Sequence, residues 1–499
     1  MEKLMKKSKE LWFIIILSVF VFAACTNNGD QVEDEENGYD VVDEAPDNGD
    51  EEVLDDVEEN GDDEVADDIE ENRALFVPGW LSLTLVTEEE RNMLLEDLDY
   101  LALAMLENSP LLGVIERRFG ITLEDALSDM RYVIYNLEVI ERNTTEEHDR
   151  AAAANNLYRL LVWFEERFER IGHFGPLLSG TYIELLEMDL AWLHQSEIVD
   201  DRIIFDGEDV GDARRLQTRI EVFGSESSLL FYDVELDELD LERDLTDFGW
   251  HIEGNVTTEI IEDDRIAYVG IGSFSSNPTF DSEVLFPFFA EVQDFEHLII
   301  DLRGNLGGWA NYFEDYIMAM LIDSPVEARF NEFLVANAVA NRDYEFALAS
   351  EIMPVDELLM VDDFVNEQTL PYLNESDLER LTYVIPWHFQ IEPREDNIPF
   401  AGEIWLLVDH MSGSASELAA MKSMYSGFAT VVGVPTRRVT PTQTTHVSLP
   451  NTGIVFRIDL GYIIDDLGRS LEEYGVTPDI LSESGGVALD VVLDLIEEQ

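Results

Sequence analysis

Apolar positions between residues 87 and 170 recur at the spacing of amphipathic helices. Thr87 with Glu90 fits a capping box, and the apolar positions that follow are Leu94, Leu98, Leu101 and Met105. Pro110 ends this run, and similar runs extend from Thr122 through Leu137 and from about Glu146 to Arg170. The pattern predicts a helical N-terminal domain, residues 74–180, which closes near the Gly-flanked His173.

The spacing changes after Ile203, where short β-branched and aromatic runs replace the helical period. Residues 219–223 (RIEVF) and 228–232 (SLLFY) are typical of these runs. We therefore predict a linker and a β-rich subdomain with a small strand meander over residues 181–260.

Continuous apolar runs and helical patterns alternate in residues 261–485. The run 298–302 leads into a Gly-rich turn, and the run 404–408 leads through Ser412–Ser414 into a helix over 415–425 and a strand at 430–432. This order predicts an α/β core, interrupted by an insertion at about 331–400 and followed by a C-terminal helix over 486–499.

The first residues have the pattern of an export signal, residues 1–24. Four lysines precede an apolar run from Leu11 to Val21, and Phe22-Ala23-Ala24 precedes Cys25. Small residues before a cysteine resemble the lipobox of bacterial lipoproteins, which implies lipidation of Cys25 and a lipid anchor on the extracytoplasmic face of the cell membrane. The alternative is an uncleaved N-terminal anchor, which also places the rest of the chain outside the cytoplasm.

Cys25 is the only cysteine, so the remainder of the chain has no disulfide, no thiol nucleophile and no cysteine-based metal site. Residues 25–73 form an acidic tether, since residues 30–71 contain many carboxylates and no Lys or Arg and cannot bury enough surface to fold. The formal net charge of the chain is −78. Such a charge repels nucleic acid and anionic lipid head groups, so neither is expected as a partner.

Ser414 is the first candidate for chemistry, because it lies where a predicted buried strand turns into a helix. There its hydroxyl can project while the helix N-terminus offers unpaired N–H groups to an oxyanion. A serine in this position can also be an ordinary helix N-cap. The Gly-rich turn 301–308 (DLRGNLGG) can likewise present backbone N–H groups to a ligand, or be only a tight turn between strand and helix.

Taken together, the two turns resemble the C-terminal processing (tail-specific) peptidase family, which is related to the tricorn core. The matching segments are I-D-L-R-G-N-L-G-G at 300–308, S-A-S-E at 414–417, G-V-P-T at 433–436, L-P-N-T-G at 449–453 and L-E-E-Y-G-V-T-P-D-I at 471–480. The resemblance covers about Ile266 to Ile480. It implies a crotonase/ClpP-like core of stacked βα units, with no evident PDZ domain before it.

By position, the resemblance implies that Ser414 is the nucleophile and that the N–H of Ala415, with that of Gly307 or Gly308, binds the oxyanion. The lysine that many family members carry after G-x-P-T is missing, and arginine cannot act as a base in its place. Lys422, the only lysine after the leader, lies two helical turns beyond Ser414, too far for a Ser-Lys dyad.

Relatives that lack the lysine use a histidine from earlier in the chain and a glutamate after the core. This implies His173 as the general base and Glu472 as a supporting carboxylate. His446 and His410 are the alternative bases.

The sequence therefore predicts an extracytoplasmic serine peptidase that cleaves a peptide or protein substrate through an acyl-enzyme, without a metal or cofactor. Two alternatives stay open: a binding or scaffolding lipoprotein that has lost turnover, and an esterase or amidase acting on non-peptide substrates.

Overall fold

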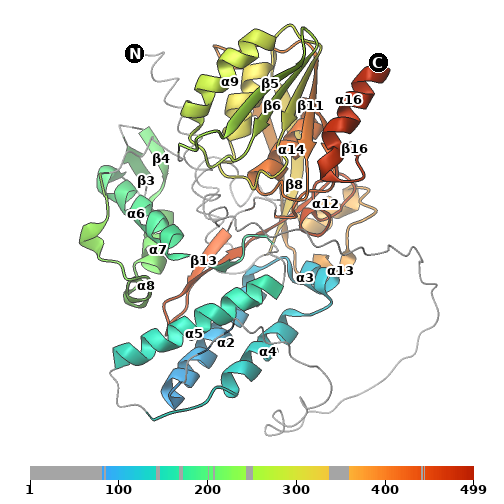
Figure 1. Ribbon diagram of the computed structural model, residues 1–499. Helices are drawn as coiled ribbons and strands as arrows, with labels where there is room; N and C mark the ends of the chain where they lie inside the picture. The colour runs from blue at the N-terminus through green and yellow to red at the C-terminus, as the bar shows by residue number, and fades with distance from the viewer. Residues whose placement is uncertain are drawn as a thin grey trace, which may run out of the picture. The chain divides into compact units, whose positions relative to one another are not determined.

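The computed structural model describes residues 81–335 and 359–499, apart from short gaps at 82, 84–85, 142–145, 168–171, 200–201, 206–207, 243–250, 440–441 and 443. Cys25 and the predicted signal and tether lie outside the described residues. The predicted fold class is confirmed: an α/β core is joined to a helical N-terminal region and to smaller antiparallel sheets (Figure 1).

The core is a six-stranded sheet with the strand order β16-β12-β11-β7-β6-β5. Its strands are β5 (Val256–Glu262), β6 (Ile266–Ile271), β7 (His297–Asp301), β11 (Glu403–Val408), β12 (Thr430–Gly433) and β16 (Ile480–Leu481). Only β5 runs antiparallel to its neighbour. The carboxyl ends of β7 and β11 therefore lie at one edge, where both Gly-rich turns begin.

Helices cover both faces of this sheet, as Figure 1 shows. On one face Leu298 and Ile300 of β7 pack with α9 (Pro278–Val292) and α14 (Ala415–Ser426). On the other face Ile299 packs with α16 (Ala488–Glu498). Burial on both sides explains why β7 is a continuous apolar run and does not alternate with polar residues.

The N-terminal region is helical, as predicted. Its helices are α2 (Glu88–Asn108), α3 (Leu112–Phe119), α4 (Leu123–Tyr135), α5 (Glu146–Arg167) and α6 (Ser179–Gln195). The capping box at Thr87 is confirmed, since its hydroxyl accepts from the N–H of Glu90 and the Glu90 carboxylate accepts from the N–H of Thr87. Thr122 and Asp125 make the same reciprocal cap at the start of α4.

Two predicted strands are wrong. Residues 219–223 belong to the helix α7 (Ala213–Phe223), and residues 228–232 belong to α8 (Glu226–Tyr232). Ala213, Leu216 and Phe223 are all buried, so the apolar period here is that of a helix, which a five-residue run is too short to reveal. The small meander lies earlier, in the antiparallel sheet of β2 (Glu197–Val199), β3 (Arg202–Phe205) and β4 (Glu208–Asp212).

Two further sheets connect the N-terminal region and the predicted insertion to the core. One has the order β15-β8-β10-β9 and consists of β8 (Val326–Leu334), β9 (Leu359–Met360), β10 (Tyr383–Ile391) and β15 (Gly461–Ile464). The other has the order β1-β14-β13 and consists of β1 (Gly175–Pro176), β13 (Thr444–Ser448) and β14 (Val455–Asp459). Residues 336–358 of the insertion lie outside the described residues.

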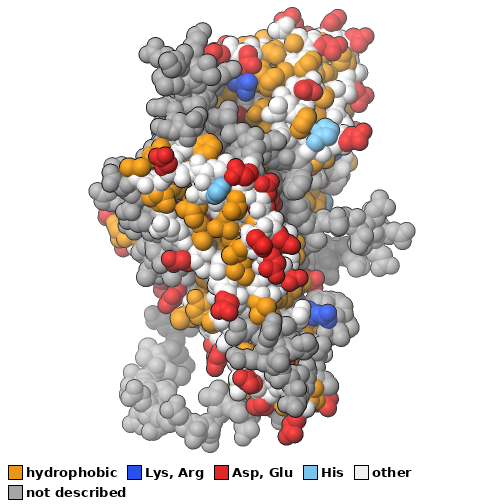
Figure 2. Space-filling model, turned by 90° about the vertical axis from the view of Figure 1, so that its left-hand side faces the viewer, with side chains coloured by type: hydrophobic (Ala, Val, Ile, Leu, Met, Phe, Trp, Pro, Cys, Tyr) orange, Lys and Arg blue, Asp and Glu red, His pale blue; other side chains and the backbone are white. Residues whose placement is uncertain are grey.

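One face of the molecule carries many acidic and few basic side chains, as the net charge leads one to expect (Figure 2). Within the described ranges, no single helix is long and apolar enough to cross a membrane. The pair α2 and α3 meets those criteria only when taken together, with a bend of 103° between them.

Candidate active site

Ser414 lies on a strained turn between β11 and α14. Its backbone has φ 54° and ψ −120°, a conformation that residues other than glycine rarely adopt. Hydrogen bonds hold it there: its N–H donates to the carbonyl of Val439 (2.8 Å) and to the Glu417 carboxylate (3.2 Å). The sequence after β11 thus forms the sharp strand-to-helix turn that was predicted.

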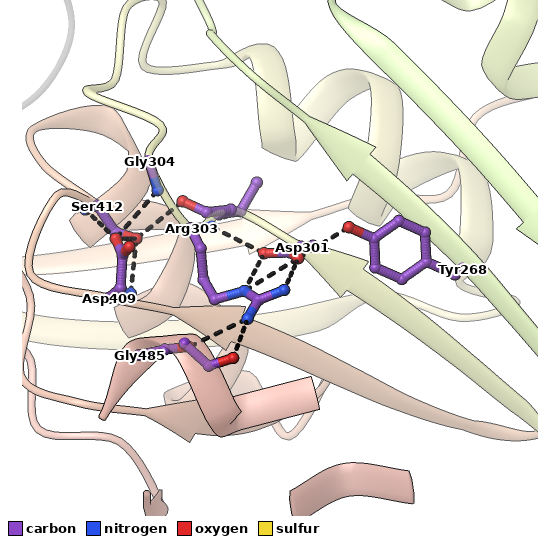
Figure 3. A network of polar contacts seen from close by, with 9 residues as sticks. Tyr268, Asp301, Arg303, Gly304, Asp409, Ser412 and Gly485 are labelled. Carbon is purple, nitrogen blue, oxygen red and sulfur yellow. Dashed lines mark hydrogen bonds and ion pairs between the residues drawn. The ribbon is translucent and has the colours of Figure 1, made fainter. Parts of the chain in front are cut away.

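The two Gly-rich turns are hydrogen bonded to each other at the edge of the sheet (Figure 3). The Asp409 carboxylate accepts from the N–H groups of Gly304 (3.0 Å) and Ser412 (3.1 Å). The Ser412 hydroxyl in turn donates to the carbonyl of Leu302 (2.8 Å), and the N–H of Gly413 donates to the carbonyl of Asn305 (3.0 Å). These bonds fix the 301–308 turn beside Ser414.

Asp301 and Arg303 anchor the first turn to the C-terminal part of the chain (Figure 3). The Arg303 guanidinium forms a two-pronged ion pair with Asp301, with a shortest distance of 2.6 Å, and it also donates to the carbonyl of Gly485 (3.0 Å). The hydrogen bond to Asp301 raises the pKa of Arg303. The Tyr268 hydroxyl donates to Oδ2 of the same carboxylate (2.8 Å), and burial raises the pKa of Tyr268 to about 12. The D-L-R part of the motif therefore supports the turn.

The turn brings the predicted oxyanion donors against the serine. A Cβ placed on Gly307 would lie 2.8 Å from Cβ of Ser414 and 2.9 Å from the Ala415 nitrogen, so the two turns are in direct contact. The N–H of Gly307 already donates to the Asn305 side chain (2.8 Å). The N–H groups of Gly308 and Ala415 have no hydrogen-bond acceptor among the described residues. Of the two glycines, Gly308 therefore has the free donor.

His173 reaches Ser414 from the N-terminal region. Its Nε2 atom lies 3.2 Å from Oγ of Ser414, within hydrogen-bond distance, and both side chains are buried. This geometry allows the imidazole to take the hydroxyl proton. The structure thus brings together the residues that the sequence singled out as nucleophile and base.

A short strand pairing holds His173 in place. In the antiparallel pairing of β1 with β14, Gly175 lies opposite Arg457 and Pro176 opposite Phe456. Continued by two residues, this register sets His173 opposite Asp459. The His173 N–H donates to the Asp459 carboxylate, and the His173 carbonyl accepts from Nε of Arg457. Both sides of the histidine backbone are therefore bound by side chains of β14.

Asp459 was not predicted from the sequence. Its Oδ1 atom lies 3.5 Å from Nδ1 of His173, on the side of the ring opposite Ser414, and its side chain is fully buried. The available signal was an acidic residue directly after the β-branched and aromatic run 454–458 (IVFRI), at the end of β14, as Asp301 is at the end of β7. In a chain with 108 acidic residues, this signal does not stand out.

Glu472 is buried in the short helix α15 (Leu471–Tyr474). Within the described part of the chain, no hydrogen bond or ion pair joins its carboxylate to Ser414 or His173. Its backbone carbonyl accepts from Arg118 of α3 (2.8 Å), and the neighbouring Glu473 pairs with Arg117 (2.8 Å). The N-terminal region therefore fixes α15, while the supporting role expected of Glu472 stays a prediction.

The other candidate residues lie apart from the serine. Lys422 forms an ion pair with Glu314, and its ammonium group lies 4.0 Å from the ring centroid of Phe389, so it is committed elsewhere. His446 packs against Phe223 with ring centroids 5.2 Å apart, and His410 is exposed on the turn after β11. No group of three or more metal-ligating side chains occurs among the described residues.

Comparison with protein families identifies the core. Residues 265–482 match the model of peptidase family S41. This segment of the chain therefore resembles an S41 peptidase. The match confirms the resemblance inferred from the ordered motifs, and it contains Ser414, both turn glycines, Asp459 and Glu472. His173 comes from the chain before the S41 segment.

Three solved structures illustrate the similarity in chain trace. They are mature CPAF complexed with lactacystin (15% identity, 83% of this chain and 100% of that chain, TM-score 0.44), the photosystem II D1 C-terminal processing protease (15%, 81% and 95%, 0.34) and the tricorn protease (17%, 47% and 18%, 0.26). A comparison with curated proteins gave no match.

Proposed function

We propose that this protein is a serine peptidase in which Ser414 attacks the substrate carbonyl and His173 is the general base. The observation that carries the proposal is the 3.2 Å distance between Nε2 of His173 and Oγ of Ser414, two buried residues from distant parts of the chain. A nucleophile and a base in mutual hydrogen-bond reach are the minimum that acyl transfer requires.

The reaction follows from these positions. His173 Nε2 takes the proton as Ser414 Oγ bonds to the carbonyl carbon, and the carbonyl oxygen becomes an oxyanion. The N–H groups of Gly308 and Ala415 donate to this oxyanion, and the N-terminus of α14 adds a favourable dipole. His173 then gives the proton to the departing amine, leaving an acyl-enzyme.

Deacylation repeats the same steps with water. Water attacks the acyl carbon while His173 takes its proton. The intermediate collapses, Ser414 recovers its proton, and the carboxylic product leaves. All proton transfers run through one imidazole nitrogen, so the proposal requires no metal or cofactor.

A fluorophosphonate probe tests this assignment, because it labels only an activated serine. We expect the wild-type protein to be labelled and Ser414→Ala to be unlabelled and inactive on peptides. Ser416→Ala is the matched control: this serine is buried in the same S-A-S-E segment and should be dispensable. Folded wild-type protein that resists labelling would instead favour the binding or scaffolding alternative.

His173 is tested separately. His173→Ala should lower kcat by about 10³-fold or more, because the serine then lacks its base. Full activity in this variant would remove His173 from the mechanism. A panel of matched peptide and ester substrates distinguishes a peptidase from an esterase, since only a peptidase needs to protonate a poor amine leaving group.

We also propose that the protein is lipid-anchored through Cys25 on the extracytoplasmic face of the membrane. The proposal is supported by the basic start, the apolar run and the small residues before Cys25. Metabolic labelling with a fatty acid should mark the wild-type protein and not Cys25→Ser. Equal labelling of both would refute the anchor.

A further inference from the structure

We propose that Asp459 is the positioning residue of the active site: it fixes the tautomer of His173 and stabilises the imidazolium formed during the reaction. This inference rests on the proposed function. It assigns to a carboxylate of β14 the role that the motifs had suggested for Glu472.

The first observation is a pair of buried polar atoms that face each other. Nδ1 of His173 and Oδ1 of Asp459 are both shielded from solvent, and neither has a hydrogen-bond partner among the described residues. They lie 3.5 Å apart, slightly beyond a hydrogen bond. Buried polar groups are normally paired, so two orphans at this distance indicate a bond that forms after a small movement.

The second observation is that the rest of the pair is already fixed. The other oxygen of Asp459 accepts from the backbone N–H of His173, and Nε of Arg457 donates to the His173 carbonyl. Gly172 has φ +57°, and a Cβ there would lie 1.8 Å from the Asp459 carboxylate. The carboxylate thus occupies the space that a side chain at position 172 would need. Rotation of the His173 and Asp459 side chains is enough to bring Nδ1 and Oδ1 within hydrogen-bond distance.

The chemistry requires a partner at this place. For Nε2 to accept the Ser414 proton, the neutral imidazole must carry its proton on Nδ1. An acceptor at Nδ1 selects this tautomer, and a carboxylate there also stabilises the positive ring once Nε2 is protonated. Catalytic hydrogen bonds are often long in unliganded proteins and shorten when substrate binds. We infer that the Nδ1–H to Oδ1 bond closes in this way.

Glu472 does not occupy this position. Among the described residues, the carboxylate within ion-pair distance of His173 Nδ1 is that of Asp459, whereas the helix of Glu472 is tied to α3 through Arg118. Asp459, in contrast, lies on the strand that pairs with β1, so the same ladder that brings His173 to the site brings its partner.

The test compares Asp459→Asn with Glu472→Gln in the full-length protein. An amide at position 459 can donate to Nδ1 and so favours the wrong tautomer, and in the best-studied serine protease this change lowers kcat about 10⁴-fold. We expect kcat of Asp459→Asn to fall about 10³–10⁴-fold with little change in KM. Glu472→Gln should retain kcat within about tenfold.

A purely structural role of Asp459 would predict a different result. A carboxylate favours the protonated ring, so its removal should shift the acid limb of the kcat/KM profile to lower pH. Loss of packing alone would lower the rate without moving that limb. Unchanged kcat in Asp459→Asn, or a large loss confined to Glu472→Gln, overturns the assignment.

Proton NMR of protein labelled with ¹⁵N-histidine gives a readout that needs no turnover. The wild-type protein carrying a phosphonate on Ser414 should show a strongly downfield Nδ1 proton. This proton should also appear in Glu472→Gln and be missing in Asp459→Asn and His173→Ala. Its absence from labelled wild type overturns the proposal even if Asp459→Asn fails to fold. If fluorophosphonate does not label the wild-type protein, this result refutes the proposed function instead. The Nδ1 proton of His173 is then measured in the protein without the phosphonate.

Discussion

His173 and Ser414 are 241 positions apart in the chain, and their side chains approach to 3.2 Å. The contact depends on β14, because this strand belongs to the S41 segment and pairs with the residues directly after His173. His173 is thus held beside Ser414 by strand pairing between two regions of the chain.

Gly172→Ala should impair catalysis far more than stability. A Cβ at this position would meet Asp459 Oδ2 at 1.8 Å, so the carboxylate or the histidine must move. Displacement of a catalytic group by about 1 Å costs on the order of 10²-fold in rate. Gly120→Ala is the matched control: its φ is +64°, yet a Cβ would meet nothing within 4 Å. Both variants place an alanine in the left-handed region, which lowers the free energy of unfolding by about 1–2 kcal/mol, as measured in denaturant. Only Gly172→Ala should also lower kcat.

Gly307→Ala should disturb the oxyanion site. The added methyl group would lie 2.8 Å from Cβ of Ser414 and 2.9 Å from the Ala415 nitrogen, which pushes the two turns apart. We expect kcat to fall about 10²–10³-fold, the loss typical for one oxyanion donor. Gly304→Ala, in the same turn with φ +78° and open space around it, should keep near wild-type kcat. Equal losses in both would show that turn flexibility, and not the contact with Ser414, matters.

Glu417→Gln should destabilise the serine turn. The Glu417 carboxylate accepts from the hydroxyl of Thr436 and from the N–H groups of Arg438 and Val439. An amide nitrogen cannot accept these bonds, so we expect a loss of about 1–3 kcal/mol in urea unfolding at pH 5, with reduced activity. Retention of stability there would mean that the loop does not depend on this carboxylate.

Glu417 also predicts a pH dependence. Burial raises its pKa to about 7, against hydrogen bonds that lower it. Between about pH 4.5 and 7, the folded protein therefore holds a proton on Glu417 that the unfolded chain has released. The stabilisation that comes from this proton is complete below about pH 4.5 and disappears as the pH rises through 7. The stability difference between wild type and Glu417→Gln should shrink from pH 5 to pH 8. A difference that stays constant or grows would contradict the raised pKa.

Lys422→Met should leave kcat unchanged. The Lys422 ammonium group pairs with Glu314 and packs on the Phe389 ring, with no contact to Ser414. The variant should lose less than the about 3–5 kcal/mol of a fully buried pair, because Glu314 keeps some exposure to solvent. A drop in kcat comparable to that of His173→Ala would restore lysine as the base.

Arg117→Ala should destabilise the contact between α3 and the predicted insertion. Arg117 makes a two-pronged bond to the buried Asp377 (2.9 and 2.7 Å) and also pairs with Glu473. Removing it leaves the buried Asp377 carboxylate without its cationic partner, with the Tyr462 hydroxyl still donating to it, which costs about 3 kcal/mol in thermal or denaturant unfolding. Arg131→Ala removes a pair with the exposed Asp99 and should cost less than about 1 kcal/mol. Similar losses would show that burial of Asp377 is unimportant.

The sequence predicted the parts of the fold that are set by local patterns. The strand at 298–302 and the turn into α14 were identified because a buried strand and a helix start each leave a signal within a few residues. The run 219–223 was assigned the wrong element, since five residues fit either period and the partners that bury it lie elsewhere in the chain.

The residues of the candidate site also differ in whether a local sequence pattern marks them. Ser414 and the glycine turn carry local motifs, and His173 was found through the family resemblance. Asp459 has neither advantage: its role depends on the register of β1 and β14, which pairs residues nearly 300 positions apart. The preference for Gly308 over Gly307 also needed the structure, because the Asn305 side chain occupies the Gly307 N–H.

The position of β14 after both residues in the sequence sets the order in which the parts of the site are made. His173 is made first, Ser414 later, and the strand that joins them last of the three. Until then the nascent chain contains a serine without a base. The proposed nucleophile and base therefore come together only after β14 has been made, and a chain that lacks this strand lacks the contact between them.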